Sequence, residues 1–261
     1  SFDYVLLDKA LEYAAEDADI TLRLYEFLKP RLQKEKQTAV YENFDRPLVQ
    51  ILKDMEHIGI MLDTKELLSL NEDFEKKMKI LEQQIYDLAG EEFNLSSPKQ
   101  IGEILYVKMG LKGKKNASGS FQTGADVLED LAEENLIAQK ILDWRGLAKL
   151  KSTYTSALLA LMDKNFRVHT TFNQTVVNTG RLASSNPNLQ NIPIRTEDGK
   201  KIRKCFIAKD GYKIIAADYS QVELRVLAHM ANDEIMVEAF NTNADIHTIS
   251  ASQVFKVPVE E

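Results

Sequence analysis

The 261-residue sequence has a single cysteine, Cys205, and no apolar run that approaches the ~20 residues a membrane span requires. One cysteine cannot form an internal disulfide, and it excludes a cysteine-rich metal cluster. We expect this thiol, between Lys204 and Phe206, to be a small buried side chain. The absent disulfides favour a reducing compartment, and no signal peptide opens the sequence. A cytoplasmic protein with no membrane partner is therefore predicted.

The sequence also has no overall excess of basic residues, with 33 Lys and Arg against 40 Asp and Glu. The formal net charge of −7 argues against a protein that coats nucleic acid indiscriminately, but net charge says little about local patches. Lysines and arginines do cluster in three segments, at residues 108–121, 145–151 and 195–209. Any one cluster alone fits a solvated face. Three clusters beside an amide-rich loop favour a polyanionic partner instead.

Helical periodicity dominates the first 165 residues. Between Leu67 and Leu88 apolar residues recur every three or four positions and stop before Gly90, which predicts one long amphipathic helix. The order Ser97-Pro98-Lys99-Gln100 is a helix-start signal. The glycine-, lysine- and serine-rich stretch 110–124 predicts a mobile loop. Further helices are expected over residues 8–36 (disturbed at Pro30), over 38–58 (closed by Gly59), from 98 to about 110, and over 137–161.

Strands are predicted only late in the chain, at residues 168–172 and 212–217, and helices resume after Ser220. The predicted fold class is α+β, predominantly helical, with two long helices forming a projecting arm. Asp218 would then stand at the end of a buried strand, where one carboxylate, substrate phosphates and water suffice to bind Mg²⁺. Its alternative role is that of a turn residue. Ser220 and Glu223 have the spacing of a capping box, which is the alternative role for Glu223.

The stretch TGRLASSNPNLQNIPIR, residues 179–195, is predicted to be an extended loop because Pro187 and Pro193 forbid a long helix. Every Watson–Crick pair shows hydrogen-bond acceptors at similar places in the DNA minor groove, so a loop of donors there senses pair shape without reading sequence. The alternative is a polar surface loop stabilised by its own side chains. The donors are Arg181, Asn188, Gln190 and Asn191.

This loop, together with DYSQVELRVLAHMA and DIHTISASQVF, resembles the family A DNA polymerases of bacteria. Upstream, RGLAKLKSTYTSAL and EEFNLSSPKQIGEIL resemble the thumb of that family. The resemblance implies palm, fingers and thumb, two Mg²⁺ ions, and attack of a primer 3′-hydroxyl on a nucleotide α-phosphate. It divides the chain into the last helix of a 3′–5′ exonuclease-like domain (1–36), a connecting helix at the palm and thumb base (37–63), a long-helix thumb (64–165), and the first part of a palm with an incomplete sheet and the start of the fingers (166–261).

The resemblance also implies roles for individual residues. Asp218 binds metal with the Tyr219 carbonyl beside it, and Glu223 closes the sugar pocket against a 2′-hydroxyl. Gln221, Arg195 and His247 line the incoming-nucleotide pocket, although His247 also fits an exposed position after Asp245 at a helix start. Arg181 contacts the minor groove at the primer terminus. Asn188, Gln190 and Asn191 belong to the same loop, Lys149 is a thumb lysine near DNA, and Tyr13 and Asp17 match the last exonuclease motif.

The family's second palm aspartate and its nucleotide-gripping helix do not occur before Glu261. Two-metal phosphoryl transfer needs carboxylates from more than one segment. The expectation is therefore part of a monomeric DNA-directed DNA polymerase of replication or repair, whose partners are primer–template DNA and deoxynucleoside triphosphates and which cannot polymerise as this piece alone. The alternatives are a primer–template binding module without catalysis and an exonuclease-related nuclease.

Overall fold

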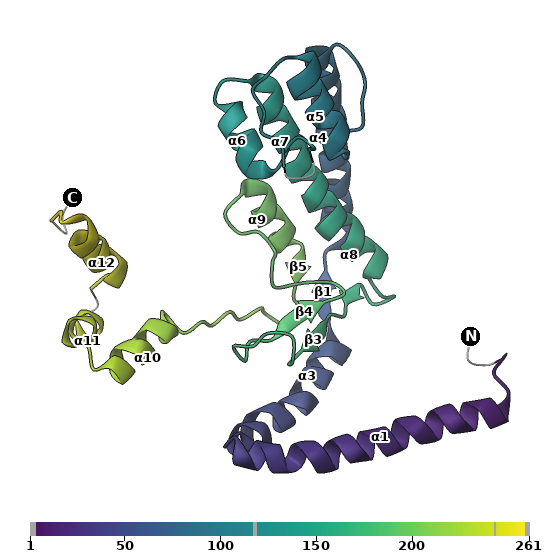
Figure 1. Cartoon of the computed structure of the whole chain (residues 1–261), viewed down its shortest axis with the longest axis vertical. Coiled ribbons are helices and arrows are strands. Elements are labelled where there is room, and N and C mark those ends of the chain that lie inside the picture. Colours follow the sequence, from purple (N-terminus) through teal and green to yellow (C-terminus); the bar gives the residue numbers. More distant parts are fainter. Residues whose placement is uncertain (1–3, 117–118, 243, 259–261) are drawn as a thin grey trace. The chain divides into compact units, whose positions relative to one another are not determined.

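The computed structural model describes residues 4–116, 119–242 and 244–258, which form two compact units, Ser1–Tyr212 and Lys213–Glu261. The larger unit is mostly helical and carries two small sheets, so the predicted α+β, predominantly helical class is confirmed (Figure 1). The first helices are α1 (Leu7–Lys34), α2 (Thr38–Val40), the π-helical turn η2 (Tyr41–Asp45) and α3 (Arg46–Ile58).

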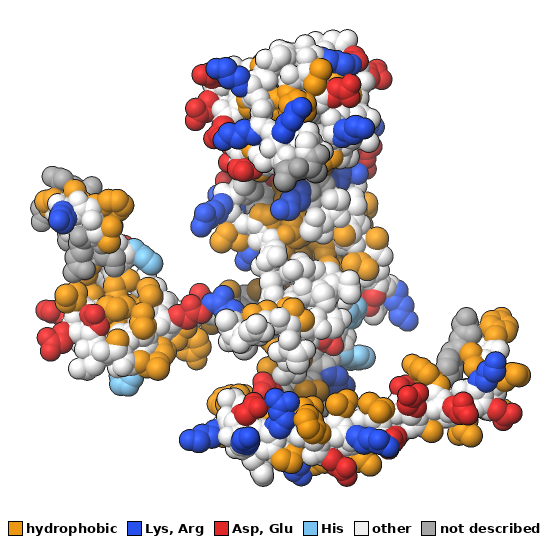
Figure 2. Space-filling view, in the orientation of Figure 1, with side chains coloured by type: hydrophobic (Ala, Val, Ile, Leu, Met, Phe, Trp, Pro, Cys, Tyr) orange, Lys and Arg blue, Asp and Glu red, His pale blue; other side chains and the backbone are white. Residues whose placement is uncertain are grey.

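Helix α1 continues through Pro30 to Lys34, so the expected disturbance does not end it. Proline removes one N–H donor, and little of the helix remains beyond it. No residue of α1 is buried, and apolar side chains lie along its surface (Figure 2). Leu11 and Phe27 are two of these exposed side chains. Helix α3 ends as predicted at Gly59, whose φ of 62° suits glycine.

Helix α4 (Thr64–Ala89) confirms the clearest periodicity of the sequence. Asp63 caps its start by accepting a hydrogen bond from the Glu66 amide, and Gly90 ends it in the left-handed conformation. Ser97 caps the next helix as predicted. The Gln100 side chain does not close a capping box but accepts from the Asn94 amide at 2.6 Å.

The larger unit continues with α5 (Pro98–Gly102), the π-helical turn η3 (Glu103–Lys108), α6 (Ala125–Ala132), α7 (Leu136–Leu150), the π-helical turn η4 (Lys151–Thr155) and α8 (Ser156–Leu161). Helix α7 packs along α4, and α6 packs on α7. The first core cluster lies among these helices and includes Ile85, Leu105, Leu128 and Ile141. The short helix α6 was not predicted from the sequence.

The three-stranded sheet joins distant parts of the chain. Strand β1 (Ile60–Leu62) lies between β2 (Arg167–Val168) and β5 (Phe206–Ile207), antiparallel to both. Strand β3 (Thr171–Asn173) pairs with β4 (Ala183–Ser185). Helix α9 (Glu197–Lys204) connects this region to β5. The second core cluster includes Leu67, Phe74, Leu158, Ile202 and Cys205, whose predicted burial is confirmed at 0% exposure.

The smaller unit contains α10 (Val222–Ala231), α11 (Glu234–Asn241) and α12 (Ile246–Phe255). The strand predicted at residues 212–217 is wrong: the segment has no regular structure, and Ile215 is 89% exposed. An apolar run becomes a strand only by pairing with a neighbour, and no described strand pairs with it. The capping box is also wrong, because α10 starts one residue too late for Ser220 to cap it. Gln221 is its N-cap, with φ 51° and no side-chain cap.

Candidate nucleic-acid interface

The loop between β4 and α9 is anchored on the side that faces the second core cluster. Leu189 and Ile192 pack against that cluster, and the Tyr154 hydroxyl donates a hydrogen bond to the Asn191 backbone carbonyl. The side chains of Asn188 and Asn191 are exposed. The loop therefore alternates between residues that hold it to the core and amides that face outward.

Some predicted donors are used inside the loop. Gln190 accepts from the Ser184 amide through Oε1 at 3.1 Å and donates to the Leu182 carbonyl through Nε2 at 2.9 Å. Asn188 Oδ1 accepts from the Gln190 amide at 3.0 Å. The alternative of a polar surface loop stabilised by its own side chains therefore applies to Gln190, whose side-chain amide makes two hydrogen bonds to nearby backbone groups. A DNA contact by Gln190 stays a prediction.

Two hydroxyl groups beneath the loop set its path. Ser184 is buried, and its Oγ lies 2.7 Å from Thr170 Oγ1 and accepts from the Leu189 amide at 3.0 Å. Thr170 Oγ1 also donates to the Pro187 carbonyl at 2.8 Å. Buried polar groups with such partners stabilise one backbone conformation. The role of Thr170 was missed because one strand was predicted over residues 168–172, whereas Thr170 lies between β2 and β3, which belong to different sheets.

The loop ends at α9, where Arg195 is exposed immediately before the N-cap Thr196. Thr196 accepts from the Gly199 amide at 3.1 Å. A Cβ atom at Gly199 would lie 2.6 Å from the Pro193 Cβ, so glycine permits the close contact of loop and helix. Arg195 therefore lies at the junction of the loop and α9, where the Thr196 cap and the contact of Gly199 with Pro193 hold the backbone.

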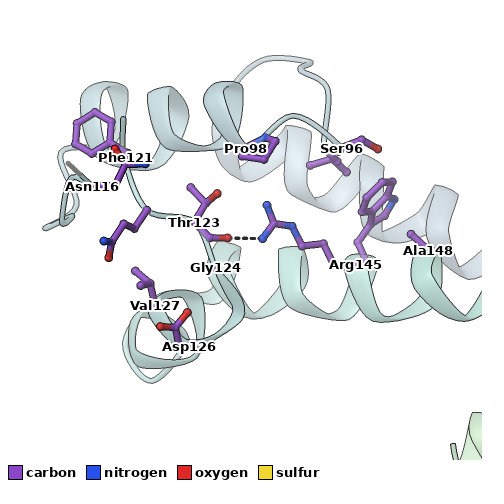
Figure 3. Close-up of a pocket in the computed structure, with 13 residues that line it drawn as sticks. Ser96, Pro98, Asn116, Phe121, Thr123, Gly124, Asp126, Val127, Arg145 and Ala148 are labelled. Carbon is purple, nitrogen blue, oxygen red and sulfur yellow. Dashed lines mark hydrogen bonds between the residues drawn. The ribbon is translucent and has the colours of Figure 1, made fainter. Parts of the chain in front are cut away.

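A groove follows one face of α7. A cavity of about 650 Å³ lies between α7, the start of α5 and the segment before α6, and Arg145 and Ala148 line it from α7 (Figure 3). Trp144 of α7 lines it as well. Arg145 donates to the Thr123 carbonyl, and burial lowers the pKa of its guanidinium, which remains a cation at neutral pH. A second cavity of about 740 Å³ continues from Trp144 and Ala148. Its polar and basic lining residues are Ser96, Lys149, Lys151, Ser152 and Ser156.

Lys149 was predicted from the sequence to lie near DNA, and the basic cluster at residues 145–151 indicated this part of α7 as a binding surface. The lining by Trp144 and Ser96 was missed. Ser96 lies 48 positions before Trp144 in the sequence, and only the packing of α7 along α4 brings the two segments to one groove.

In the smaller unit four predicted residues lie within one short segment. Asp218 and Tyr219 are exposed just before α10, Gln221 is its N-cap, and Glu223 lies exposed in its first turn. Among the residues that the structure describes, no group of three or more His, Cys, Asp or Glu side chains could hold a metal ion. The segment therefore offers one aspartate and neighbouring carbonyls rather than a complete cage.

His247 lies in the first turn of α12 with its side chain exposed. Asp245 caps this helix by accepting from the His247 amide at 3.0 Å, and the Thr248 hydroxyl donates to the same carboxylate at 2.8 Å. The Thr248 hydroxyl and the His247 amide lower the pKa of Asp245. The alternative of an exposed helix-start histidine matches this geometry, and a nucleotide contact stays a prediction.

Tyr13 and Asp17 are exposed on α1, four residues apart. The Asp17 backbone carbonyl accepts from the Thr21 hydroxyl at 2.7 Å. In the described part of the chain, neither Tyr13 nor Asp17 belongs to a group of three or more His, Cys, Asp or Glu side chains that could hold a metal ion. Within the described ranges, no helix is long and apolar enough to cross a membrane.

Comparison with known proteins gives one consistent result. Residues 64–261 match the model of DNA polymerase family A. DNA polymerase I of Rhizobium leguminosarum is 51% identical over 100% of this chain and 26% of that protein, and DNA polymerase I of Pseudomonas aeruginosa is 46% identical over 100% of this chain and 29% of that protein. The chain thus spans between a quarter and a third of the length of these relatives.

A solved structure extends the likeness to three dimensions. The POL domain of Pol1 from M. smegmatis, in complex with DNA primer-template and dNTP, is 39% identical to this chain and superposes with a TM-score of 0.83. The match covers 92% of this chain and 43% of that one.

Proposed function

Because the chain belongs to DNA polymerase family A, we propose that it is part of a DNA-directed DNA polymerase and holds primer–template DNA for nucleotide addition. The observation that carries this proposal is the loop of residues 181–195. It is held to the core by Leu189, Ile192 and the Tyr154 hydroxyl while its asparagines stay exposed. Donors on a rigid loop can test the minor-groove acceptors of any correct base pair.

The α7 groove supplies the sequence-independent part of binding. Lys149 and Lys151 line it, and Lys151 is also 3.7 Å from the Glu75 carboxylate. Lysines that contact phosphates bind DNA by releasing counterions, so their contribution falls as salt rises. We assign the DNA backbone to this groove and the primer-terminal base pair to Arg181, Asn188, Gln190 and Asn191.

The segment before α10 is assigned to the nucleotide and its metal. Asp218 and the Tyr219 carbonyl are oxygen ligands of the kind that Mg²⁺ prefers, and they are exposed just before α10. Mg²⁺ would supply neutralisation of phosphate charge. Gln221, Arg195 and His247 are assigned to the incoming nucleotide, and Glu223 to the exclusion of a 2′-hydroxyl.

The test is fluorescence anisotropy with a labelled primer–template duplex and this chain across a salt series. Arg181→Ala and Lys149→Ala should each weaken binding, and the loss of one phosphate contact at Lys149 should reduce the salt slope by about 1. Lys164→Ala, an exposed lysine outside both surfaces, is the matched control. Equal effects of all three variants, or no binding by the unmodified chain, would contradict the proposal.

Binding without catalysis is a second candidate for this chain, favoured by the single aspartate before α10. Mg²⁺-dependent primer extension by the chain and by Asp218→Ala separates the two candidates. No extension by either protein supports binding alone, whereas extension that Asp218→Ala abolishes requires a second carboxylate in these residues. Degradation of the primer that Asp17→Ala abolishes would instead support the nuclease alternative.

A further inference from the structure

Two buried tyrosines of the larger unit have the same arrangement. Each lies on a π-helical turn, and each hydroxyl donates to a backbone carbonyl of a loop: Tyr106 on η3 to Gln122 at 2.8 Å, and Tyr154 on η4 to Asn191. Tyr106 is 7% exposed and Tyr154 is 5% exposed. A π-helical turn adds a residue to the helix and redirects the side chains that follow, and such turns are frequent at functional sites.

The turn η4 is itself tied to α4. Thr155 Oγ1 donates to Asn71 Oδ1 at 2.7 Å, and Ser156 Oγ donates to the same oxygen at 2.9 Å. The Tyr154 ring belongs to the second core cluster, which Leu189 and Ile192 of the loop also contact. Burial raises the pKa of Tyr154, so its hydroxyl stays protonated and able to donate. The position of the hydroxyl is therefore set by the core and not by the loop.

We propose that Tyr154 is a positioning residue, whose hydroxyl holds the Asn191 carbonyl and thereby places the exposed amides of residues 188–191 against the primer-terminal base pair. This inference rests on the proposed function of the loop. Lys151 of the α7 groove lies on the same π-helical turn, three residues before Tyr154. One turn thus links the surface assigned to the DNA backbone with the loop assigned to the base pair, and fixes the spacing between them.

Tyr154→Phe tests the role, because it keeps the ring in the core and removes only the donor. The matched control is Tyr86→Phe on α4, whose hydroxyl has two acceptors within reach, Glu82 Oε1 at 2.8 Å and the Phe93 carbonyl at 2.9 Å, both distant in sequence from the loop. Hydrogen exchange of the free chain is measured first. We expect amides of residues 188–192 to exchange about fivefold faster in Tyr154→Phe and at the unmodified rate in Tyr86→Phe.

The second measurement is the ratio of affinities for duplexes with a matched and a mismatched primer terminus. We expect Tyr154→Phe to reduce this ratio about threefold while the salt slope stays that of the unmodified chain, because the phosphate contacts remain. A merely structural role would lower both affinities together and leave the ratio unchanged. Ile192→Val removes one methyl group from a second side chain that anchors the loop. It should also raise the amide exchange rate of residues 188–192 and reduce the ratio of the two affinities. This variant replaces Tyr154→Phe if the latter does not fold.

Faster exchange together with a reduced ratio supports the proposal. The proposal is overturned if Tyr154→Phe leaves the amide exchange rates of residues 188–192 unchanged. It is also overturned if the unmodified chain prefers a matched primer terminus and Tyr154→Phe leaves that preference unchanged. If the unmodified chain fails to bind primer–template DNA, the proposed function fails instead, and that result is seen before any variant is compared.

Discussion

At the scale of single residues, the burial of Cys205 has a chemical consequence. Desolvation raises the pKa of its thiol to about 11, and the thiol donates to the Lys201 carbonyl, with 3.4 Å between Sγ and the oxygen. The thiolate is the reactive form, and its fraction at pH 8 is small. We expect iodoacetamide to leave the folded chain unlabelled at pH 8 over the time in which the denatured chain is fully labelled, as mass spectrometry can measure. Rapid labelling of the folded chain would contradict the burial.

Asp163 stabilises the turn before β2. Its Oδ1 accepts from the backbone amides of Arg167 and Asn165, both at 2.8 Å, and the Arg167 amide is the largest cause that lowers the pKa of this carboxyl. A lowered pKa in the folded state means stability that is present above the unfolded value of about 3.9 and is lost as pH falls through the folded pKa.

The expected result is that Asp163→Asn lowers the free energy of unfolding at pH 7, and that its difference from the unmodified chain shrinks below about pH 4. Urea unfolding followed by circular dichroism at several pH values measures this. Asp73→Asn on α4 is the control, because the Asp73 carboxylate lies 2.8 Å from the Lys77 ammonium group, a side-chain rather than a backbone partner. A difference that grows with acid would contradict the assignment.

At the scale of elements, Gly59 lets α3 pass directly into β1. Its backbone has φ 62° and ψ −171°, and a Cβ atom there would lie 2.5 Å from the Val168 carbonyl oxygen of the paired strand β2. Gly59→Ala should therefore cost at least about 1–3 kcal/mol in the free energy of unfolding. Gly146→Ala is the matched control: Gly146 lies inside α7 with open space around it, and alanine there should stabilise by about 0.5–1 kcal/mol. Thermal unfolding distinguishes the opposite signs.

At the scale of the whole molecule, the two units differ in how much apolar surface they bury. Both core clusters belong to the larger unit, whereas the buried apolar residues recorded in the described part of the smaller unit are Ala228, Ala239 and Ile246. Exposed segments without regular structure are preferred sites of proteolysis. Limited trypsin digestion should cut first after Lys213, as mass spectrometry of a time course would reveal. First cuts within α4 or α7 would contradict this division.

Several features were predictable because they depend on neighbours in sequence. The apolar spacing of α4, its end at Gly90, the cap at Ser97 and the close of α3 at Gly59 are local properties, and all four are confirmed. The motifs of residues 179–195 and 218–231 were sufficient to indicate the family, since side-chain identity is itself the signal. Burial of Cys205 also followed from its type.

Tertiary structure decided the features that depend on partners distant in sequence. The run at 212–217 has the composition of a strand but no described strand beside it, and β1 is a strand only because β2 and β5 flank it. The start of α10 moved past Ser220 because Gln221 adopts a left-handed conformation. The bond from Tyr154 to Asn191 joins residues 37 positions apart, which no local pattern encodes. Sequence alone determined the long helix α4 and the family, because apolar spacing and motif identity are local properties, whereas tertiary packing determined which loop is anchored and which hydroxyl anchors it.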